Sequence, residues 1–147
     1  MRPIIKTFFE ILHTETPDLK VGVAGFCWGG RYSILLGQAS FNDTPLVNAV
    51  FAGHPSMLSI PKDIGEPVCP ISLAVASTDM VYSVSMAEET EKIWKRIGDV
   101  KYESIVYEGA KHGFCVRGNM KDEKEKEYMV QSIDQVLETL RWLIVGC

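Results

Sequence analysis

Cys27, in the stretch GVAGFCWGG, is the residue of this sequence whose neighbours most favour covalent chemistry. It is the central residue of a G-x-C-x-G pattern that runs from Gly25 to Gly29 and follows a short apolar segment. Small residues two before and two after a nucleophile let the chain turn sharply between a strand and a helix, so the side chain projects into a cleft. A helix N-terminus also favours the thiolate. The pattern therefore predicts a nucleophilic thiol, and the alternative is a small buried cysteine.

Two further residues could serve such a nucleophile, Asp79 in ASTDMVYS and His112 in EGAKHGFCVRG. The order nucleophile, acid, histidine along the chain is that of the α/β-hydrolases. Taken alone, Asp79 would suit an ordinary turn or cap, and that alternative stays open. His112 lies in a glycine-flanked loop where a core histidine is not expected, so we predict that it is a general base.

Other residues near these motifs have less specific settings. The backbone N–H of Trp28, next after the nucleophile, is a natural donor for an oxyanion hole. His54, in GHPS, either lines the pocket or holds a loop. His13 ends the first predicted helix, where it can interact with the last carbonyls. The remaining cysteines are expected to be small buried hydrophobes or idle thiols: Cys69, Cys115 and Cys147.

These residues can meet only if the elements that carry them end at the same edge of a sheet. Apolar runs bounded by turn residues predict strands at 20–26, 45–53, 70–77 and 101–109, with a connection at 54–69. Helical spacing predicts helices over 4–12, 29–38, 83–97 and 121–144. Strands that alternate with helices indicate a parallel sheet between two helix layers, with ligand sites at the carboxyl ends of the strands. Cys27, His54, Asp79 and His112 each follow a predicted strand and should share that edge.

Four of these elements carry more detailed expectations. The continuous apolar run 20–26 predicts a strand covered on both faces, whereas the alternation in 101–109 predicts a strand nearer an edge. In the helix 83–97, Ser85 and Glu88 suggest a capping box, and Gly98 ends the helix. The apolar faces of the last two helices are predicted to be Met86, Ile93, Trp94 and Ile97, and Met129, Ile133, Val136, Leu137, Leu140 and Leu143.

Composition excludes several classes of protein. The chain of 147 residues is of single-domain size, and its 15 basic and 19 acidic residues give a net charge of −4 without a basic run, so nucleic acid is not an expected partner. Lys6 and Glu10 interrupt the apolar N-terminus, and no segment is apolar over a membrane-spanning length, so we expect a cytoplasmic protein without a membrane partner. The four scattered cysteines indicate neither a disulfide framework nor a metal site.

Taken together, GFCWGG, GHPS, ASTDMVYS and YEGAKHGFCVRG resemble the dienelactone hydrolase family, whose members are cysteine-using α/β-hydrolases. The resemblance covers nearly the whole chain. It implies that Cys27 is the nucleophile, His112 the base and Asp79 the residue that orients the histidine. It also implies hydrolysis of small carboxylic esters or lactones through a thioester acyl-enzyme, with no metal or organic cofactor.

The chain departs from the family at its beginning. Family members have several strands before the first helix predicted here, so residues 1–147 resemble the C-terminal portion of one partial, N-terminally truncated domain. Strand 20–26 would then have an open edge that could pair with a second copy. The alternative function is therefore a catalytically impaired remnant that acts as an oligomerising or protein-binding module. Glutamine amidotransferases also use such an elbow, but their H-x-E should follow the cysteine, and here Gly113 and Phe114 follow His112.

Overall fold

The computed structural model describes residues 1–98 and 100–145, with side chains up to Leu143. Its elements alternate between helix and strand, as the sequence predicts. In chain order they are α1 (Pro3–Glu15), β1 (Gly22–Phe26), α2 (Trp28–Leu36), β2 (Ser40–Phe41), β3 (Thr44–Pro45), β4 (Ala49–Gly53), β5 (Ile71–Ala76), α3 (Val84–Ile97), β6 (Tyr102–Tyr107), α4 (Phe114–Arg117) and α5 (Glu123–Val145).

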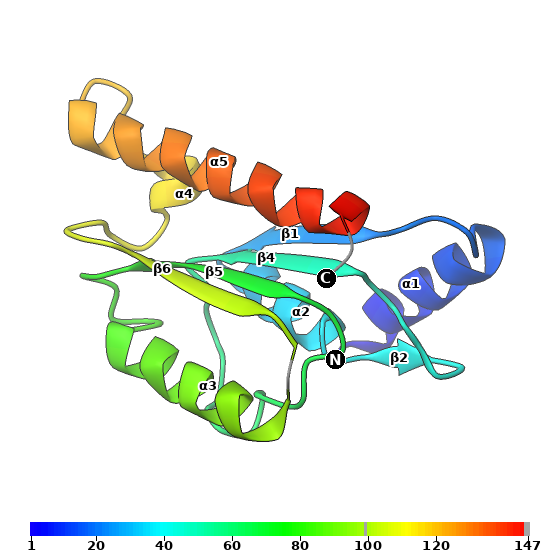
Figure 1. Ribbon diagram of the computed structural model, residues 1–147. Helices are drawn as coiled ribbons and strands as arrows, with labels where there is room; N and C mark the ends of the chain where they lie inside the picture. The colour runs from blue at the N-terminus through cyan, green and yellow to red at the C-terminus, as the bar shows by residue number, and fades with distance from the viewer. Residues whose placement is uncertain (99, 146–147) are drawn as a thin grey trace.

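Four parallel strands form the main sheet in the spatial order β1, β4, β5, β6. Helix α5 covers one face of this sheet, and helices α2 and α3 cover the other (Figure 1). At the carboxyl ends of the strands, Phe26 pairs with Gly53 and Ala76 with Tyr107. The predicted three-layer α/β architecture is therefore confirmed, and the loops after all four strands lie along one edge.

The two central strands, β4 and β5, are largely apolar because both of their faces are buried. Every residue of β4 (AVFAG) and β5 (ISLAVA) is buried, which explains their continuous apolar runs. Strand β6 is an edge strand, as predicted, and exposes Ile105 and Val106. The prediction for β1 was wrong, because Ala24 is exposed and only Gly25 of its five residues is buried. As the other edge strand, β1 lacks the second neighbour that would complete its burial.

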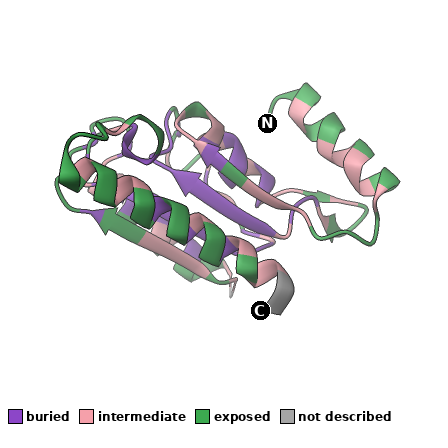
Figure 2. Cartoon of the chain, turned by 90° about the horizontal axis from the view of Figure 1, so that it is seen from above, coloured by how far each residue is buried: buried purple, intermediate pink, exposed green. Residues whose placement is uncertain are grey.

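Buried residues gather in the sheet, in α2 and in the loops at the carboxyl ends of the strands, whereas α1 carries none (Figure 2). One apolar cluster lies on the side of α2 and α3 and includes Trp94 and Tyr82. A second cluster, on the side of α5, includes Phe51, Phe114 and Cys115. The second cluster includes residues of the segment after β6, so that segment packs against the sheet.

Helix α5 packs on the sheet through polar side chains as well as through part of the predicted apolar face, of which Val136 and Leu140 are partly buried. Ser132, Gln135 and Thr139 are buried, whereas Ile133 and Leu137 are about half exposed. The amide nitrogen of Gln135 donates to the hydroxyl of Ser72 and to the carbonyl of Leu73, and its oxygen accepts from the hydroxyl of Tyr107. These bonds satisfy the hydrogen-bonding groups of the Gln135 amide, so this polar side chain can be buried between the helix and the sheet.

Helix α3 ends at Gly98, as predicted, but its N-terminus differs. The N-cap is Ser83, whose hydroxyl accepts from the N–H of Met86 at 3.3 Å, so Ser85 and Glu88 do not form a capping box. Trp94 is fully buried on the predicted face, whereas Ile97 at the last turn is exposed.

A short hairpin of two strands and a short helix were missed. Strands β2 and β3 form a hairpin whose turn residues, Asn42 and Asp43, both have positive φ, as a two-residue hairpin turn requires. The predicted strand 45–53 is therefore divided between β3 and β4. Helix α4 lies within the loop that carries His112.

Gly25, the first glycine of the G-x-C-x-G pattern, lets α2 cross closely over the end of β1. A Cβ atom at this position would lie 2.2 Å from the hydroxyl oxygen of Ser33 and 2.4 Å from the carbonyl oxygen of Gly29. Gly29, the second glycine, has no atom within 4 Å of such a Cβ. The two glycines therefore differ, and only the first is required for packing.

We predict that Gly25→Ala lowers the free energy of unfolding by about 1–3 kcal/mol, because the clash with a backbone carbonyl cannot be relieved by rotating a side chain. Gly29→Ala, the matched control, should leave the stability unchanged or raise it by up to about 1 kcal/mol, since it replaces glycine within a helix. Urea unfolding of both variants measures the difference. Equal effects would contradict this account of the elbow.

Candidate active site

Cys27 lies between β1 and α2 with a backbone conformation that L-residues rarely adopt. Its φ is 53° and its ψ is −120°, which is strained for a side chain with a Cβ. Its N–H donates to the carbonyl of Gly53 at 3.0 Å, and its own carbonyl accepts from the N–H of Ser56 at 3.0 Å. The loop after β4 therefore fixes the strained residue from both sides.

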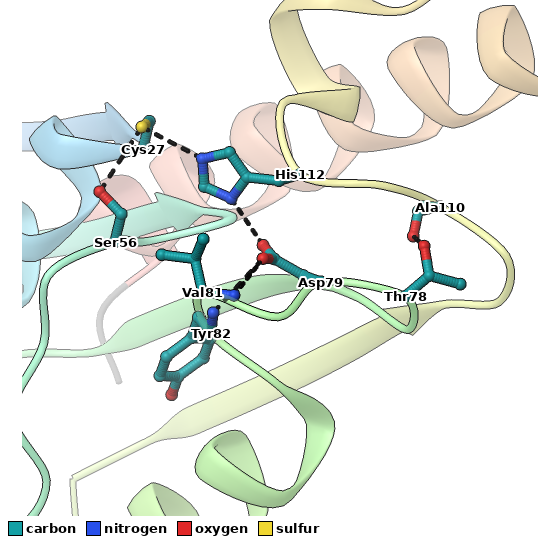
Figure 3. Close-up of polar contacts among 8 residues, drawn as sticks. All are labelled: Cys27, Ser56, Thr78, Asp79, Val81, Tyr82, Ala110 and His112. Atoms are coloured by element: carbon teal, nitrogen blue, oxygen red, sulfur yellow. Dashed lines mark hydrogen bonds and ion pairs between the residues drawn. The ribbon is translucent and has the colours of Figure 1, made fainter.

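Cys27, His112 and Asp79 form one continuous set of contacts, as the labelled side chains in Figure 3 show. Nε2 of His112 lies 3.2 Å from Sγ of Cys27, and Nδ1 of His112 lies 2.7 Å from Oδ2 of Asp79. The three residues come from the loops after β1, β5 and β6. The sheet thus brings together three groups that are up to 85 residues apart in the sequence.

Asp79 is held by backbone donors and by a link between the two loops. Its side chain is fully buried, and its Oδ1 accepts from the N–H of Val81 at 2.7 Å. The neighbouring Thr78 donates from its hydroxyl to the carbonyl of Ala110 at 2.6 Å, two residues before His112 (Figure 3). Asp79 is therefore both a turn residue and the partner of the histidine.

The thiol and the imidazole shift each other toward an ion pair. The hydrogen bond with Ser56 lowers the pKa of Cys27 most, and the bond with His112 lowers it further against the opposing effect of burial. Burial alone would lower the pKa of His112, but its hydrogen bonds to Cys27 and Asp79 raise it above the usual value. Both directions favour thiolate beside imidazolium, which is the reactive form of a cysteine nucleophile.

His54 lies under this pair and has no exposed surface. Its ring centroid is 5.0 Å from that of His112, and neither of its ring nitrogens has a hydrogen-bond partner among the described residues. Burial, with the charge of His112, lowers the pKa of His54 to about 4, so its ring is neutral near pH 7. The ring of His54 is therefore enclosed against that of His112, and its contact with a substrate stays a prediction.

Ser56 is the residue of the site that the sequence reasoning missed. Its hydroxyl oxygen lies 3.5 Å from Sγ of Cys27, and the side chains of Ser56 and His112 reach the sulfur from different directions (Figure 3). The signal was present in GHPS, because the argument that places the loop after the second strand at the site edge applies to Ser56 as well as to His54.

Trp28 begins α2, and its backbone N–H hydrogen-bonds the Cys27 side chain, which places this donor beside the sulfur. Its indole is 42% exposed and rests on the ring of Tyr32, with a centroid separation of 4.5 Å. The guanidinium of Arg2 lies 5.4 Å from the same ring. The side chain of Trp28 thus lies at the surface in contact with Tyr32 and Arg2.

The other cysteines have different settings. Cys69 and Cys115 are both buried, and Cys69 contacts the carbonyl of Gly37. Burial raises the pKa of Cys115 to about 12, so this thiol is protonated and unreactive near neutral pH. Cys147 lies outside the described residues.

A cavity of about 130 Å³ lies beside His112, lined in part by Phe114, Arg117 and Tyr128. A larger hollow of about 720 Å³ lies between β6 and α5, away from the three contacting residues.

Within residues 1–98 and 100–145, no three acidic, histidine or cysteine side chains are grouped so that they could hold a metal ion. In the same part of the chain, no helix has the length and apolar character needed to cross a bilayer.

Comparison with known sequences identifies the family. The model of the dienelactone hydrolase family matches residues 5–142. The protein named hydrolase tropI, from Talaromyces stipitatus, is 24% identical over 139 residues, which is 92% of this chain and 51% of that protein. Protein usf from Aquifex pyrophilus is 34% identical over 100 residues, 67% of this chain and 41% of that protein. The chain thus spans about half the length of the relatives it matches.

Solved structures support the fold. An alpha-beta serine hydrolase homologue from Coxiella burnetii has a TM-score of 0.64 at 14% identity and matches 92% of this chain and 56% of its own. A thermophilic esterase from Thermogutta terrifontis, solved with propionate bound, has a TM-score of 0.60 at 15% identity and matches 80% of this chain and 55% of its own. At these identities the likeness concerns the fold alone.

The coupling of His112 to its carboxylate can be tested with Asp79→Asn. We expect the pKa of His112 to fall, because the imidazolium loses its anionic partner while its burial stays. The pKa of Cys27 should rise in turn, because less imidazolium remains beside the sulfur. NMR titration of the histidine rings measures the first change, with His112 identified by the signal that His112→Gln removes. Asp134→Asn, at an exposed position of α5, is the control. An unchanged His112 titration in Asp79→Asn would refute the coupling.

Proposed function

We propose, from the premise that this chain belongs to the dienelactone hydrolase family, that it hydrolyses small carboxylic esters or lactones with Cys27 as nucleophile. The observation that carries the proposal is the continuous contact from the sulfur of Cys27 through His112 to the carboxylate of Asp79. The shifted pKa values of Cys27 and His112 support it, since they favour the ion pair that such a nucleophile needs.

In the first half-reaction, the Cys27 thiolate attacks the carbonyl carbon, and the electron pair of the C=O bond moves to oxygen. The N–H of Trp28, which already lies beside the sulfur, donates to this oxyanion. As the tetrahedral intermediate collapses, the C–O bond to the leaving group breaks and the His112 imidazolium gives its proton to the departing oxygen. The products are a thioester on Cys27 and an alcohol, which stays attached to the acyl group when the substrate is a lactone.

In the second half-reaction, the now neutral His112 takes a proton from water, and the hydroxide attacks the thioester carbonyl. Collapse of this intermediate breaks the C–S bond and returns the electron pair to sulfur, so thiolate and imidazolium are restored with release of the carboxylic acid. Asp79 stabilises the imidazolium and keeps Nε2 directed at the sulfur. The scheme uses only these side chains and water, without a cofactor.

A panel of activated esters and small lactones tests this proposal. Cys27→Ala should lose on the order of a thousandfold or more of the hydrolytic rate, because it removes the nucleophile. Cys115→Ala is the matched control, since that thiol is buried and protonated, and it should retain the activity. Intact mass spectrometry during turnover should show an added acyl group that Cys27→Ala lacks. Equal rates of hydrolysis by the native chain and by Cys27→Ala would refute the assignment of Cys27 as the nucleophile.

A second candidate function, self-association through β1, is favoured by the edge position of that strand. The outer side of β1 has no strand neighbour among the described residues, and α1, which precedes β1 in the chain, exposes Ile4, Phe8 and Ile11. An unpaired edge of this kind offers backbone donors and acceptors to a second copy. This role does not depend on the chemistry of Cys27.

Light scattering across a range of concentrations tests the second candidate. If β1 pairs between copies, the native chain should form dimers, and Ala24→Lys should shift them toward monomer because it places a charge on that strand. Ile105→Lys, at an exposed position of the opposite edge strand β6, is the control and should leave the dimer intact. A native chain that stays monomeric at all concentrations would rule out this role.

A further inference from the structure

The hydroxyl of Ser56 meets the sulfur of Cys27 at 3.5 Å, from a different direction than His112 (Figure 3). We propose that Ser56 is a further catalytic residue, whose hydroxyl donates a hydrogen bond to the Cys27 thiolate and holds it ready for attack together with His112. The proposal deepens the function proposed above and rests on it for the chemical step. It assigns to Ser56 a direct contact with the reacting atom.

The direction of this hydrogen bond follows from the chemistry of the two groups. A thiolate has no proton and can only accept, whereas a serine hydroxyl has one proton to give. Ser56 is 6% exposed, so its proton has little access to bulk water, and Sγ of Cys27 lies within hydrogen-bond distance. A bond to a charged acceptor is about twice as strong as one between neutral groups, so the ionised sulfur gains most from it.

The backbone of the loop after β4 places the hydroxyl accurately. His54 has a φ of 35° and its N–H donates to the carbonyl of Ala74 at 2.8 Å, which ties the start of the loop to β5. Pro55 then packs against α2, where a Cβ on Gly30 would lie 3.1 Å from it. The N–H of Ser56 finally donates to the carbonyl of Cys27. Ser56 therefore binds both the main chain and the side chain of the nucleophile.

The other titratable groups near the sulfur do not supply the uncharged donor that we assign to Ser56. His112 supplies the cationic partner, with Asp79 behind it. His54 is neutral near pH 7 because burial lowers its pKa to about 4, so it adds no charge to the site. Ser56 contributes a donor that carries no charge and keeps its proton throughout the reaction, whereas His112 must give up its own.

This difference assigns the two donors separate parts of the cycle. In the first half-reaction His112 passes its proton to the leaving oxygen, and it then takes one from water. When the C–S bond breaks in the second half-reaction, the electron pair returns to sulfur, and a donor that is still in place lowers the cost of that charge. Ser56 should therefore assist the departure of the thiolate from the thioester as well as its formation in the resting protein.

Alkylation of Cys27 by iodoacetamide, followed across pH by peptide mass spectrometry, tests the proposal without requiring any esterase activity. In Ser56→Ala the pH midpoint of alkylation should rise, and the rate at pH 6 should fall by roughly tenfold, as the loss of a hydrogen bond to a charged group predicts. Ser56→Thr keeps the hydroxyl and should resemble the native chain. Ser104→Ala, which removes a buried hydroxyl without a partner among the described residues, is the control.

Two isosteric variants control for the effect of altered packing at this buried position. Ser56→Thr and Ser56→Val have nearly the same shape and differ in the hydroxyl, so a shifted midpoint in the valine variant alone supports the proposal. If Ser56→Ala and Ser56→Val keep the native midpoint while His112→Gln moves it, Ser56 is not a donor to the sulfur.

Turnover of a reactive ester separates this proposal from the proposed function. With Ser56→Ala, the initial burst should persist while the steady-state rate falls, because deacylation loses the donor to the leaving sulfur. A chain that hydrolyses no ester, but whose alkylation midpoint depends on Ser56, would refute the proposed function and leave the hydrogen bond standing. Normal hydrolysis with native burst and midpoint in Ser56→Ala would refute the role of Ser56.

Discussion

The strained backbone of Cys27 is the constraint on which the site depends. A residue with φ of 53° and a Cβ is held there because the loop after β4 bonds it on both sides, through the carbonyl of Gly53 and the N–H of Ser56. This conformation directs the sulfur toward His112. The pairing of Phe26 with Gly53 in the sheet sets the two loops side by side, so strand register determines the position of a reactive atom.

Parallel strand pairing also assembles the rest of the triad. Because Ala76 pairs with Tyr107, the loops that carry Asp79 and His112 leave the sheet as neighbours, and the bond from Thr78 to Ala110 ties them together. Each loop contributes one group, and main-chain donors and acceptors of these loops and of the loop after β4 anchor Cys27 and Asp79. The pairing of the parallel strands therefore places residues from separate parts of the sequence side by side at one edge of the sheet.

The sequence predicted those parts of the molecule that depend on local pattern and on strand order. It located Cys27, Asp79 and His112, because each follows an apolar run at the carboxyl end of a strand. It missed the contact between Ser56 and the sulfur, since the turn that returns this hydroxyl to Cys27 depends on the φ of His54. For α5 it found apolar residues that are partly buried, such as Val136, but it missed Gln135, because periodicity cannot reveal that this amide finds three hydrogen-bond partners on the sheet.

Cys27 and Cys115 show which features make a thiol reactive in this fold. Both lie at the N-terminal end of a helix, so the helix dipole alone does not distinguish them. Burial raises the pKa of Cys115 to about 12 despite a hydrogen bond with Ser132, whereas the pKa of Cys27 is lowered, first by Ser56 and then by His112. The decisive difference is that Cys27 is only partly buried and has donors on two sides, one of which is cationic. One hydroxyl does not offset desolvation at Cys115, whereas at Cys27 a hydroxyl and an imidazolium together do, so the lowered pKa of Cys27 depends on the loop after β4 as well as on the histidine.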